Sequence, residues 1–294
     1  MISVYPLHGT GGLSTSTLVS WEGKRFLLDT GPGTITEIWR RGLRLRGLSA
    51  ILLSHTHLDH LWGLPPLLWF LHQRDWSHEL QLIFPSESET IIKQMVALSG
   101  NPEFVAFTPY SSAGESIHHK SLTIQPFAVN HPGPSYGYVI SESPKPRLNT
   151  EKLRKEGIPQ IKWRTIAKGK KVKYKSRPIN AQDYQLAPRC RKIVYTGDAG
   201  PASQLVDQAR GADLLIIEAS WLYPQWNVQT DAPHLTLRQA FEIGLKSKAE
   251  RLLLFHLTSR VAIKDYQAAI TALQKEFKTP LQVFLPTHES IDIR

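Results

Sequence analysis

The chain has 294 residues, of which 41% are hydrophobic and 20% are charged. This length and composition fit one large globular domain or two small ones with a buried core, and they exclude a disordered, collagen-like or coiled-coil protein. The formal net charge of +10 favours a polyanionic partner.

Neither a membrane span nor a secretory signal is expected. The longest apolar run, residues 61–71, is interrupted by Gly63, Pro65 and Pro66, and it is shorter than the ~18–20 residues that a span needs. The first residues show no basic start followed by an apolar stretch. The single cysteine, Cys190, has no partner for an intramolecular disulfide, which favours a reducing compartment. We therefore expect a cytoplasmic protein without membrane contact.

Short strands joined by glycine-rich turns are expected in the N-terminal half. Residues 14–20 and 25–29 fit two strands around a turn at residues 22–23. The apolar run within residues 49–54 fits a buried strand, and residues 61–74 fit a helix. Ser86 and Glu89 have the spacing of a capping box and predict the start of another helix. Strands are predicted next at 122–129 and 136–140.

The positive charge is concentrated in one segment. Residues 145–192 contain 16 Lys and Arg but only three acidic residues, and several prolines interrupt the segment. We expect residues 141–191 to form an inserted, protruding basic arm with little core of its own, within a single domain that spans residues 1–294. A solvated basic loop is the alternative interpretation of such a run of charge.

After this segment the pattern becomes regularly α/β. Strands are predicted at 192–196, 213–217, 251–255 and 281–285, and helices at 201–210 and 264–277. A further helix is predicted to begin at Thr236, with Gln239 at capping-box distance. Strands that alternate with helices favour sheets whose outer faces are covered by helices.

The most informative motif is His55-Thr-His-Leu-Asp-His60, which follows a predicted strand and precedes a predicted helix. Imidazole and carboxylate groups are ligands of Zn²⁺ and similar ions, and a turn can direct them at two metals. His131, Asp198 and His256 each stand at the end of a further predicted strand. Each of these three alone fits an ordinary turn or core residue, but together with the motif they favour a dinuclear metal site.

The motif resembles that of the metallo-β-lactamase superfamily, and His131, Asp198 and His256 are similar to its later ligands. The resemblance implies an αββα sandwich, of class α/β or α+β, with two facing mixed sheets, outer helices and a dinuclear site at the sheet edges. A narrower resemblance is to the ribonuclease Z family. It is carried by the segments 55–68, 131–140, 148–159, 211–219, 234–240 and 256–260.

We hypothesise that His55, His57 and His131 bind one ion, that Asp59, His60 and His256 bind the other, and that Asp198 bridges both. Two close divalent ions can hold a water as hydroxide and neutralise phosphodiester oxygens. Zn²⁺ is favoured by the histidine-rich ligands, and Mn²⁺ is the alternative.

The resemblance also implies a substrate and roles for further residues. It implies an endonuclease that removes the 3′ trailer from precursor tRNA, with Asp59 orienting or deprotonating the water and His234 protonating the leaving 3′ oxygen. The basic arm stands where the family carries its tRNA-binding arm, and the family commonly forms homodimers. The candidate substrate-binding residues are Lys168, Lys170, Lys171, Lys173, Lys175 and Arg177 in the arm and Arg260 in the segment 256–260.

Two alternatives remain open. The chain could be a hydrolase of the same fold that acts on a small phosphodiester or another ester. The absence of the family's Gly-Pro step after Pro159 and the compact loop at residues 8–13 favour this interpretation, whereas the basic arm opposes it. An RNA-binding protein with a degenerate site is the second alternative, and the full set of seven ligands opposes it.

Overall fold

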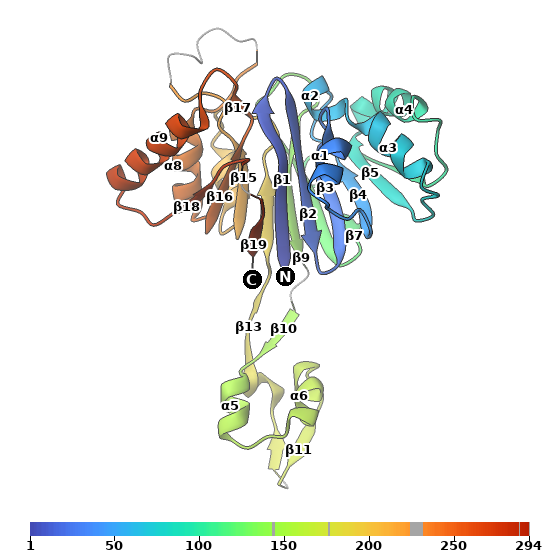
Figure 1. The fold of residues 1–294 in the computed structure, drawn as a ribbon. Coiled ribbons are helices and arrows are strands. Elements are labelled where there is room, and N and C mark those ends of the chain that lie inside the picture. Colours follow the sequence, from blue (N-terminus) through green and yellow to red (C-terminus); the bar gives the residue numbers. More distant parts are fainter. Residues whose placement is uncertain (143–144, 176, 224–231, 288, 294) are drawn as a thin grey trace.

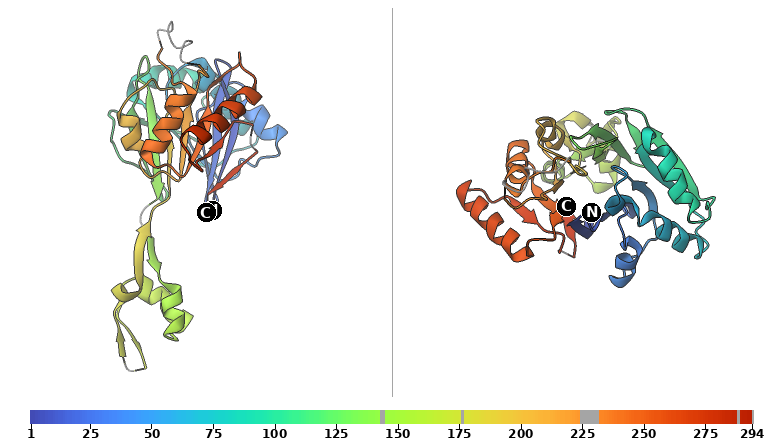
Figure 2. Two further views of the ribbon diagram at one scale, coloured as in Figure 1. Left: turned by 90° about the vertical axis from the view of Figure 1, so that its left-hand side faces the viewer. Right: turned by 90° about the horizontal axis from the view of Figure 1, so that it is seen from above.

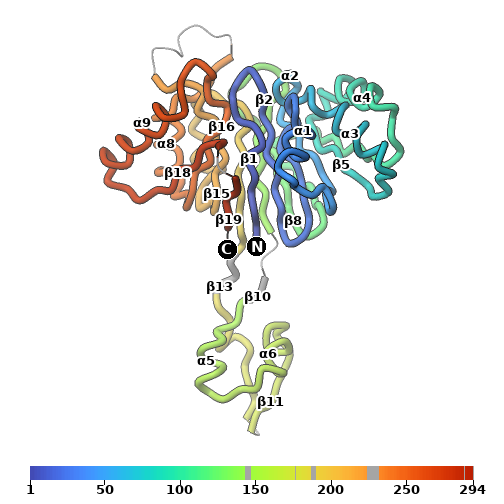
Figure 3. The backbone as a smooth tube through the Cα atoms, in the orientation of Figure 1, coloured from blue at the N-terminus to red at the C-terminus, as the bar shows by residue number. Residues whose placement is uncertain are grey.

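The computed structural model describes residues 1–142, 145–175, 177–223, 232–287 and 289–293. Within these ranges, two mixed β-sheets face each other, and helices cover both outer faces (Figure 1; Figure 2, right). The αββα sandwich expected from the sequence is confirmed. A narrow arm projects from one end of the sandwich (Figure 3). None of the described helices has the length and apolar character that crossing a membrane requires.

The first sheet has eight described strands in the order β17-β1-β2-β3-β4-β5-β6, with β19 also paired to β1. Strands β1 to β3 form antiparallel pairs, whereas β3 to β6 are parallel. The strands are β1 (Ile2–Gly11), β2 (Ser14–Trp21), β3 (Lys24–Leu28), β4 (Leu48–Leu52), β5 (Leu80–Pro85), β6 (Val105–Tyr110), β17 (Leu257–Thr258) and β19 (Ile291–Ile293).

The second sheet has seven described strands in the order β18-β16-β15-β14-β9-β8-β7. Strands β14, β15, β16 and β18 are parallel, and β9 pairs antiparallel with β14. The strands are β7 (Ile117–His119), β8 (Leu122–Ala128), β9 (Tyr136–Glu142), β14 (Lys192–Tyr195), β15 (Leu214–Glu218), β16 (Arg251–Phe255) and β18 (Gln282–Phe284).

Helices pack on the outer face of each sheet. The first sheet carries α1 (Thr34–Arg40), α2 (Leu58–Leu61), α3 (Leu64–His72) and α4 (Glu89–Ala97), and the second carries α7 (Gln204–Ala209), α8 (Leu237–Ser247) and α9 (Ile263–Glu276). Strand β4 shows why its sequence is a continuous apolar run. Ala50 and Leu52 face the second sheet, while Ile51 faces the helices, so both faces of the strand are buried.

Two local predictions were wrong for identifiable reasons. The helix expected at 61–74 is divided, because Gly63 approaches the preceding loop too closely for any side chain. Its N–H donates to the Thr30 carbonyl at 2.7 Å, and a Cβ at this position would lie 2.0 Å from the Gly31 carbonyl oxygen. No capping box forms at Ser86, whose hydroxyl instead bonds to Glu87, and a short 3₁₀ helix, η1 (Ser86–Ser88), precedes α4.

The capping box predicted at Thr236 is confirmed. Thr236 accepts a hydrogen bond from the Gln239 N–H at 3.2 Å, and the Gln239 side chain accepts one from the Thr236 N–H at 2.9 Å. This reciprocal pair fixes the start of α8 directly after His234.

The basic segment forms a folded arm on a two-stranded stem, β10 (Lys145–Leu148) and β13 (Gln185–Arg189). The arm contains α5 (Thr150–Lys155), α6 (Gln160–Ala167), β11 (Val172–Tyr174), β12 (Arg177–Ile179) and the 3₁₀ helix η2 (Ala181–Tyr184). Leu153, Ile158 and Ile166 are buried in a hydrophobic cluster of its own. The expectation of little core was therefore wrong, because each short element contributes only one or two apolar residues and produces no periodic pattern.

Candidate metal centre and active site

The predicted ligands meet at the end of the sandwich opposite the arm (Figure 1). The carboxyl ends of the parallel strands of both sheets lie at this end. His55 and His57 lie in the loop after β4, Asp198 follows β14, and His256 directly follows β16. The common direction of these strands brings residues from distant parts of the sequence to one edge.

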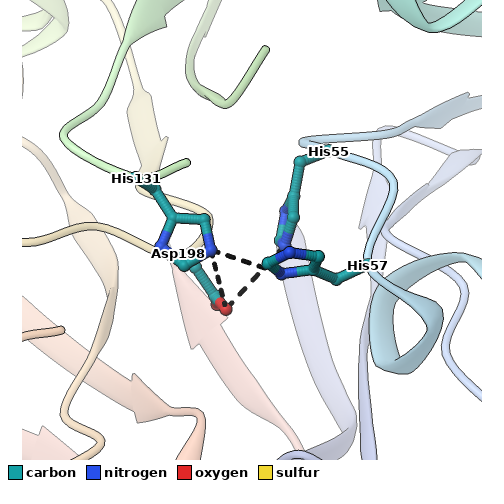
Figure 4. Close-up of side chains that lie close together, drawn as sticks. All are labelled: His55, His57, His131 and Asp198. Atoms are coloured by element: carbon teal, nitrogen blue, oxygen red, sulfur yellow. Dashed lines mark hydrogen bonds and ion pairs between the residues drawn. The ribbon is translucent and has the colours of Figure 1, made fainter. Parts of the chain in front are cut away.

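The first cluster contains His55, His57, His131 and Asp198, whose ligand atoms all lie within 4.8 Å of one another. His55 and His57 project from one loop toward His131 and Asp198 on the facing side (Figure 4). His131 Nε2 lies 3.3 Å from His57 Nδ1 and 4.0 Å from Asp198 Oδ2.

The second cluster contains Asp59, His60 and His256 at similar spacing. His256 Nε2 lies 3.2 Å from Asp59 Oδ2 and 3.0 Å from Asp198 Oδ2, and His60 Nε2 lies 3.1 Å from Asp198 Oδ1. The Asp198 carboxylate thus contacts groups of both clusters. The structure brings all seven predicted ligands together in one site.

Two histidines of the site are oriented by Asp29, which the sequence analysis missed. The Asp29 carboxylate is fully buried and accepts hydrogen bonds from the Ser54 N–H at 2.7 Å, from Ser54 Oγ at 2.6 Å and from His60 Nδ1 at 2.7 Å. Because the Ser54 hydroxyl donates to Asp29, it accepts from His55 Nδ1 at 2.9 Å. His55 and His60 therefore both turn Nε2 toward the centre, as metal-binding histidines commonly do.

A second buried carboxylate, Glu218, was also missed. Glu218 Oε2 accepts from His234 Nδ1 at 2.8 Å and from Ser220 Oγ at 2.6 Å. The Ser220 hydroxyl in turn accepts from His256 Nδ1 at 2.8 Å, so one carboxylate orients both His234 and His256. Glu218 ends β15 within an otherwise apolar strand, and a lone acid at a buried strand end was the available signal.

Burial keeps two of the histidines neutral. It holds the pKa of His55 well below its usual value and lowers the pKa of His131 to about 4. The neutral imidazole is the form that binds a metal ion. Burial alone would raise the pKa of Asp59, but the hydrogen bond with His256 and the charge of His60 hold it below its usual value. Asp59 is therefore ionised at neutral pH.

Two other histidines have raised pKa values although burial acts in the opposite direction. The carboxylates of Asp198 and Asp29 raise the pKa of His60 well above its usual value. The hydrogen bond to Glu218 raises the pKa of His234. His234 consequently holds a proton more readily than an ordinary histidine, and its ring is stacked on that of His256 with centroids 5.0 Å apart.

The chemistry of this site fits divalent metal ions. His55 Nε2 is buried, faces Asp198 Oδ2 at 3.9 Å, and makes no hydrogen bond with any described residue. A buried polar atom without a partner is costly unless a ligand satisfies it. Five imidazoles and two carboxylates provide borderline and hard donors, the combination that zinc and manganese accept.

A cleft of about 430 Å³ opens over these residues. Its lining includes Asp59, His234 and Arg260, together with Trp221 and the Gly11–Leu13 turn. Arg260 therefore lies at the site, as a substrate-binding role would require. The other six candidate substrate residues, which we call the arm cations, are all exposed at the far end of the molecule; they are Lys168, Lys170, Lys171, Lys173, Lys175 and Arg177.

Comparison with known families agrees with this geometry. The profile described as Metallo-beta-lactamase superfamily matches residues 9–142, and the profile described as Beta-lactamase superfamily domain matches residues 151–257. Human tRNase Z, short form, superposes with a TM-score of 0.66 at 19% identity and covers 99% of each chain. This likeness establishes the fold.

The sequence comparison is more specific. Ribonuclease Z of Sulfolobus acidocaldarius is 30% identical over 274 residues, which are 92% of this chain and 89% of the relative. Ribonuclease Z of Pyrococcus abyssi is 30% identical over 284 residues, which are 92% of both chains. The chain belongs to the ribonuclease Z family of the metallo-β-lactamase superfamily.

Proposed function

We propose that this protein is a metal-dependent endoribonuclease that removes the 3′ trailer from precursor tRNA. The observation that carries the proposal is the convergence of seven metal-ligand side chains in a chain of the ribonuclease Z family. Human tRNase Z, whose name specifies tRNA, shares the fold over almost the whole chain. The cytoplasmic location expected from the sequence is part of this proposal.

We assign one ion to His55, His57 and His131 and the other to Asp59, His60 and His256, with Asp198 shared by both. Zn²⁺ is the proposed metal because five of the seven ligands are imidazoles. When bound, two such ions supply positive charge for the phosphodiester oxygens and lower the pKa of a water molecule. The hydrogen bonds that Asp29, Ser54 and Ser220 accept from histidine Nδ1 atoms support this assignment, since they turn the Nε2 atoms of these histidines toward the centre.

Asp59 and His234 are the proposed catalytic residues. The Asp59 carboxylate is ionised and lines the cleft, so it can accept a hydrogen bond or a proton from the attacking water. Its Oδ2 atom is held by the Gly12 N–H at 3.1 Å. His234 Nδ1 donates to Glu218, which leaves Nε2 as the atom that donates a proton to the leaving 3′ oxygen. The raised pKa of His234 supports a general acid.

The arm is the proposed docking site for the tRNA body, acting as a unit of residues 141–191 separate from the catalytic sandwich. Residues 145–192 hold 16 Lys and Arg against three acids, whereas the rest of the chain holds 19 against 22. The net positive charge of the chain thus comes entirely from residues 145–192. Contacts of the arm cations with phosphates would position the RNA without reading its sequence.

We further propose a homodimer in which the arm of one chain serves the site of the other. The arm projects from one end of the sandwich, whereas α2, which contains Asp59 and His60, lies at the opposite end (Figure 1). The segment from α1 to α3 carries four large apolar side chains that are 50% to 72% exposed, and they are the proposed contacts with a second copy. They are Trp39, Leu58, Trp62 and Trp69. Mixing a chain that carries Asp59→Ala with a chain whose six arm cations are replaced by Glu should then restore cleavage. Trp62→Glu should abolish the dimer, as measured by sedimentation.

The function is tested by incubating zinc- or manganese-loaded protein with a precursor tRNA that carries a 3′ trailer and mapping the product end. Cleavage just after the acceptor stem, lost in Asp59→Ala, is expected. Bis(4-nitrophenyl) phosphate provides the comparison substrate. Hydrolysis of this small diester without cleavage of the precursor would mean that the alternative, a phosphodiesterase acting on small substrates, is correct.

A further inference from the structure

Trp221 forms part of the wall of the active-site cleft, beside the proposed proton donor. Its indole lies with its ring centroid 6.4 Å from that of His234, at an interplanar angle of 76°. The same cleft is lined by Asp59 and Arg260. An aromatic side chain therefore borders the place where the scissile phosphate must lie if Asp59 and His234 act on it.

The backbone of Trp221 is fixed by the segment that carries His234. The Trp221 N–H donates to the Leu235 carbonyl at 3.2 Å, and its own carbonyl accepts from the Leu237 N–H at 2.8 Å. These bonds form a parallel bridge between Trp221 and Thr236. The backbone of Trp221 is thus tied to the segment that directly follows His234, which keeps the two residues beside each other.

The indole is partly exposed, but its N–H is not. Trp221 lines the cleft with part of its surface exposed, whereas its Nε1 atom is buried and donates no hydrogen bond to any residue that the structure describes. Because a buried N–H cannot reach a ligand in the cleft, the ring is the part of Trp221 that can contact one.

The chemistry of the reaction identifies the nucleotide. His234 is proposed to protonate the leaving O3′, which belongs to the nucleotide on the 5′ side of the broken bond. We propose that Trp221 stacks on the base of this nucleotide, the last one of the tRNA product, and so sets the cleavage position. This inference rests on the proposed function. Stacking tolerates any base, since every base offers a π face.

The test combines variants of the protein with variants of the substrate. Trp221→Ala should lower kcat/KM for the precursor by about 5- to 150-fold, the range of one base–aromatic stack. Trp221→Phe should retain most of the activity, whereas Trp221→Leu, which keeps apolar bulk but no ring, should resemble alanine. Removing the base at the proposed nucleotide should slow the wild-type enzyme by a similar factor and should slow Trp221→Ala no further.

A control separates stacking from a structural role. Phe107, an aromatic residue 37% exposed on β6 and absent from the lining of the cleft, is replaced by Ala. This change should alter neither the cleavage of the precursor nor the hydrolysis of bis(4-nitrophenyl) phosphate. Equal fractional losses of Trp221→Ala on the precursor and on bis(4-nitrophenyl) phosphate, or loss of bound zinc, would show that Trp221 only supports the site. Additive losses from the variant and the abasic substrate would also overturn the proposal. Failure of the wild-type protein to cut any precursor would instead refute the proposed function, and the stacking with it.

Discussion

Replacement of Glu218 by Gln should damage both stability and activity. The carboxylate is fully buried and accepts four hydrogen bonds, two at Oε1 from the Ala199 and Leu235 N–H groups and two at Oε2 from Ser220 and His234. A glutamine can accept at only one of these positions and presents an NH₂ group at the other. Two donors therefore lose their acceptor, which should cost about 2–6 kcal/mol at ~1–3 kcal/mol for each unsatisfied buried group.

Thermal unfolding should detect this loss as a fall in Tm of several degrees, up to about 10 °C for a chain of this size. Precursor cleavage should fall more than the folded fraction, because the carboxylate positions His234. Asp213→Asn is the matched control. Asp213 is a buried carboxylate that accepts from the Lys192 N–H at 2.7 Å, and it precedes β15 at the end of this strand opposite Glu218, so its loss should lower Tm and leave cleavage by the folded enzyme unchanged. A Glu218→Gln protein with wild-type Tm and wild-type cleavage would refute the reasoning.

Three further predictions concern the arm and the sandwich. Reversing the six arm cations to Glu should weaken precursor binding and flatten its salt dependence by about 0.7–0.9 in the log–log slope for each phosphate that the arm no longer neutralises, as filter binding measures. Leu153→Ala, in the buried arm cluster, should destabilise the arm by about 2–5 kcal/mol and expose it to limited proteolysis, without loss of bound zinc. Burial, with the charge of Lys120 adding to it, lowers the pKa of His119 from 6.5 to about 4. Between these values the unfolded chain binds a proton that the native chain does not. Acidification should therefore destabilise the wild type relative to His119→Gln by up to about 1.4 kcal/mol per pH unit in urea unfolding, with no effect above pH 6.5.

The sequence was most informative where chemistry and local spacing coincide. His55, His57, Asp59 and His60 occur within six positions of one loop, so their proximity follows from the chain itself. The strands that precede Asp198 and His256 were predicted because both of their faces are buried, which produces short continuous apolar runs. The parallel arrangement of β14 to β16 then places both residues at the same edge.

The features that the sequence did not reveal depend on tertiary contact. β1 was not predicted as a strand, because Pro6 and its glycines interrupt the alternating pattern, and the strand changes register between Pro6 and His8. The division between α2 and α3 depends on the distance from Gly63 to the Gly31 carbonyl. Neither a register shift nor a close approach leaves a periodic signal in one sequence.

The supporting carboxylates illustrate the same limit at the site. Asp29 and Glu218 each stand at the end of an apolar run, but a single acid at a strand end is also typical of an ordinary turn, so this signal alone does not identify a group that supports the site. Their importance arises because each accepts hydrogen bonds from histidines far along the chain, His60 for Asp29 and His234 for Glu218. Ligand types can therefore be predicted from composition and spacing, whereas the groups that orient them become visible only when the sheets have brought distant strand ends together. Both carboxylates are fully buried. Substituting either one should therefore act on the orientation of the histidines, and only through them on the surface that meets the substrate.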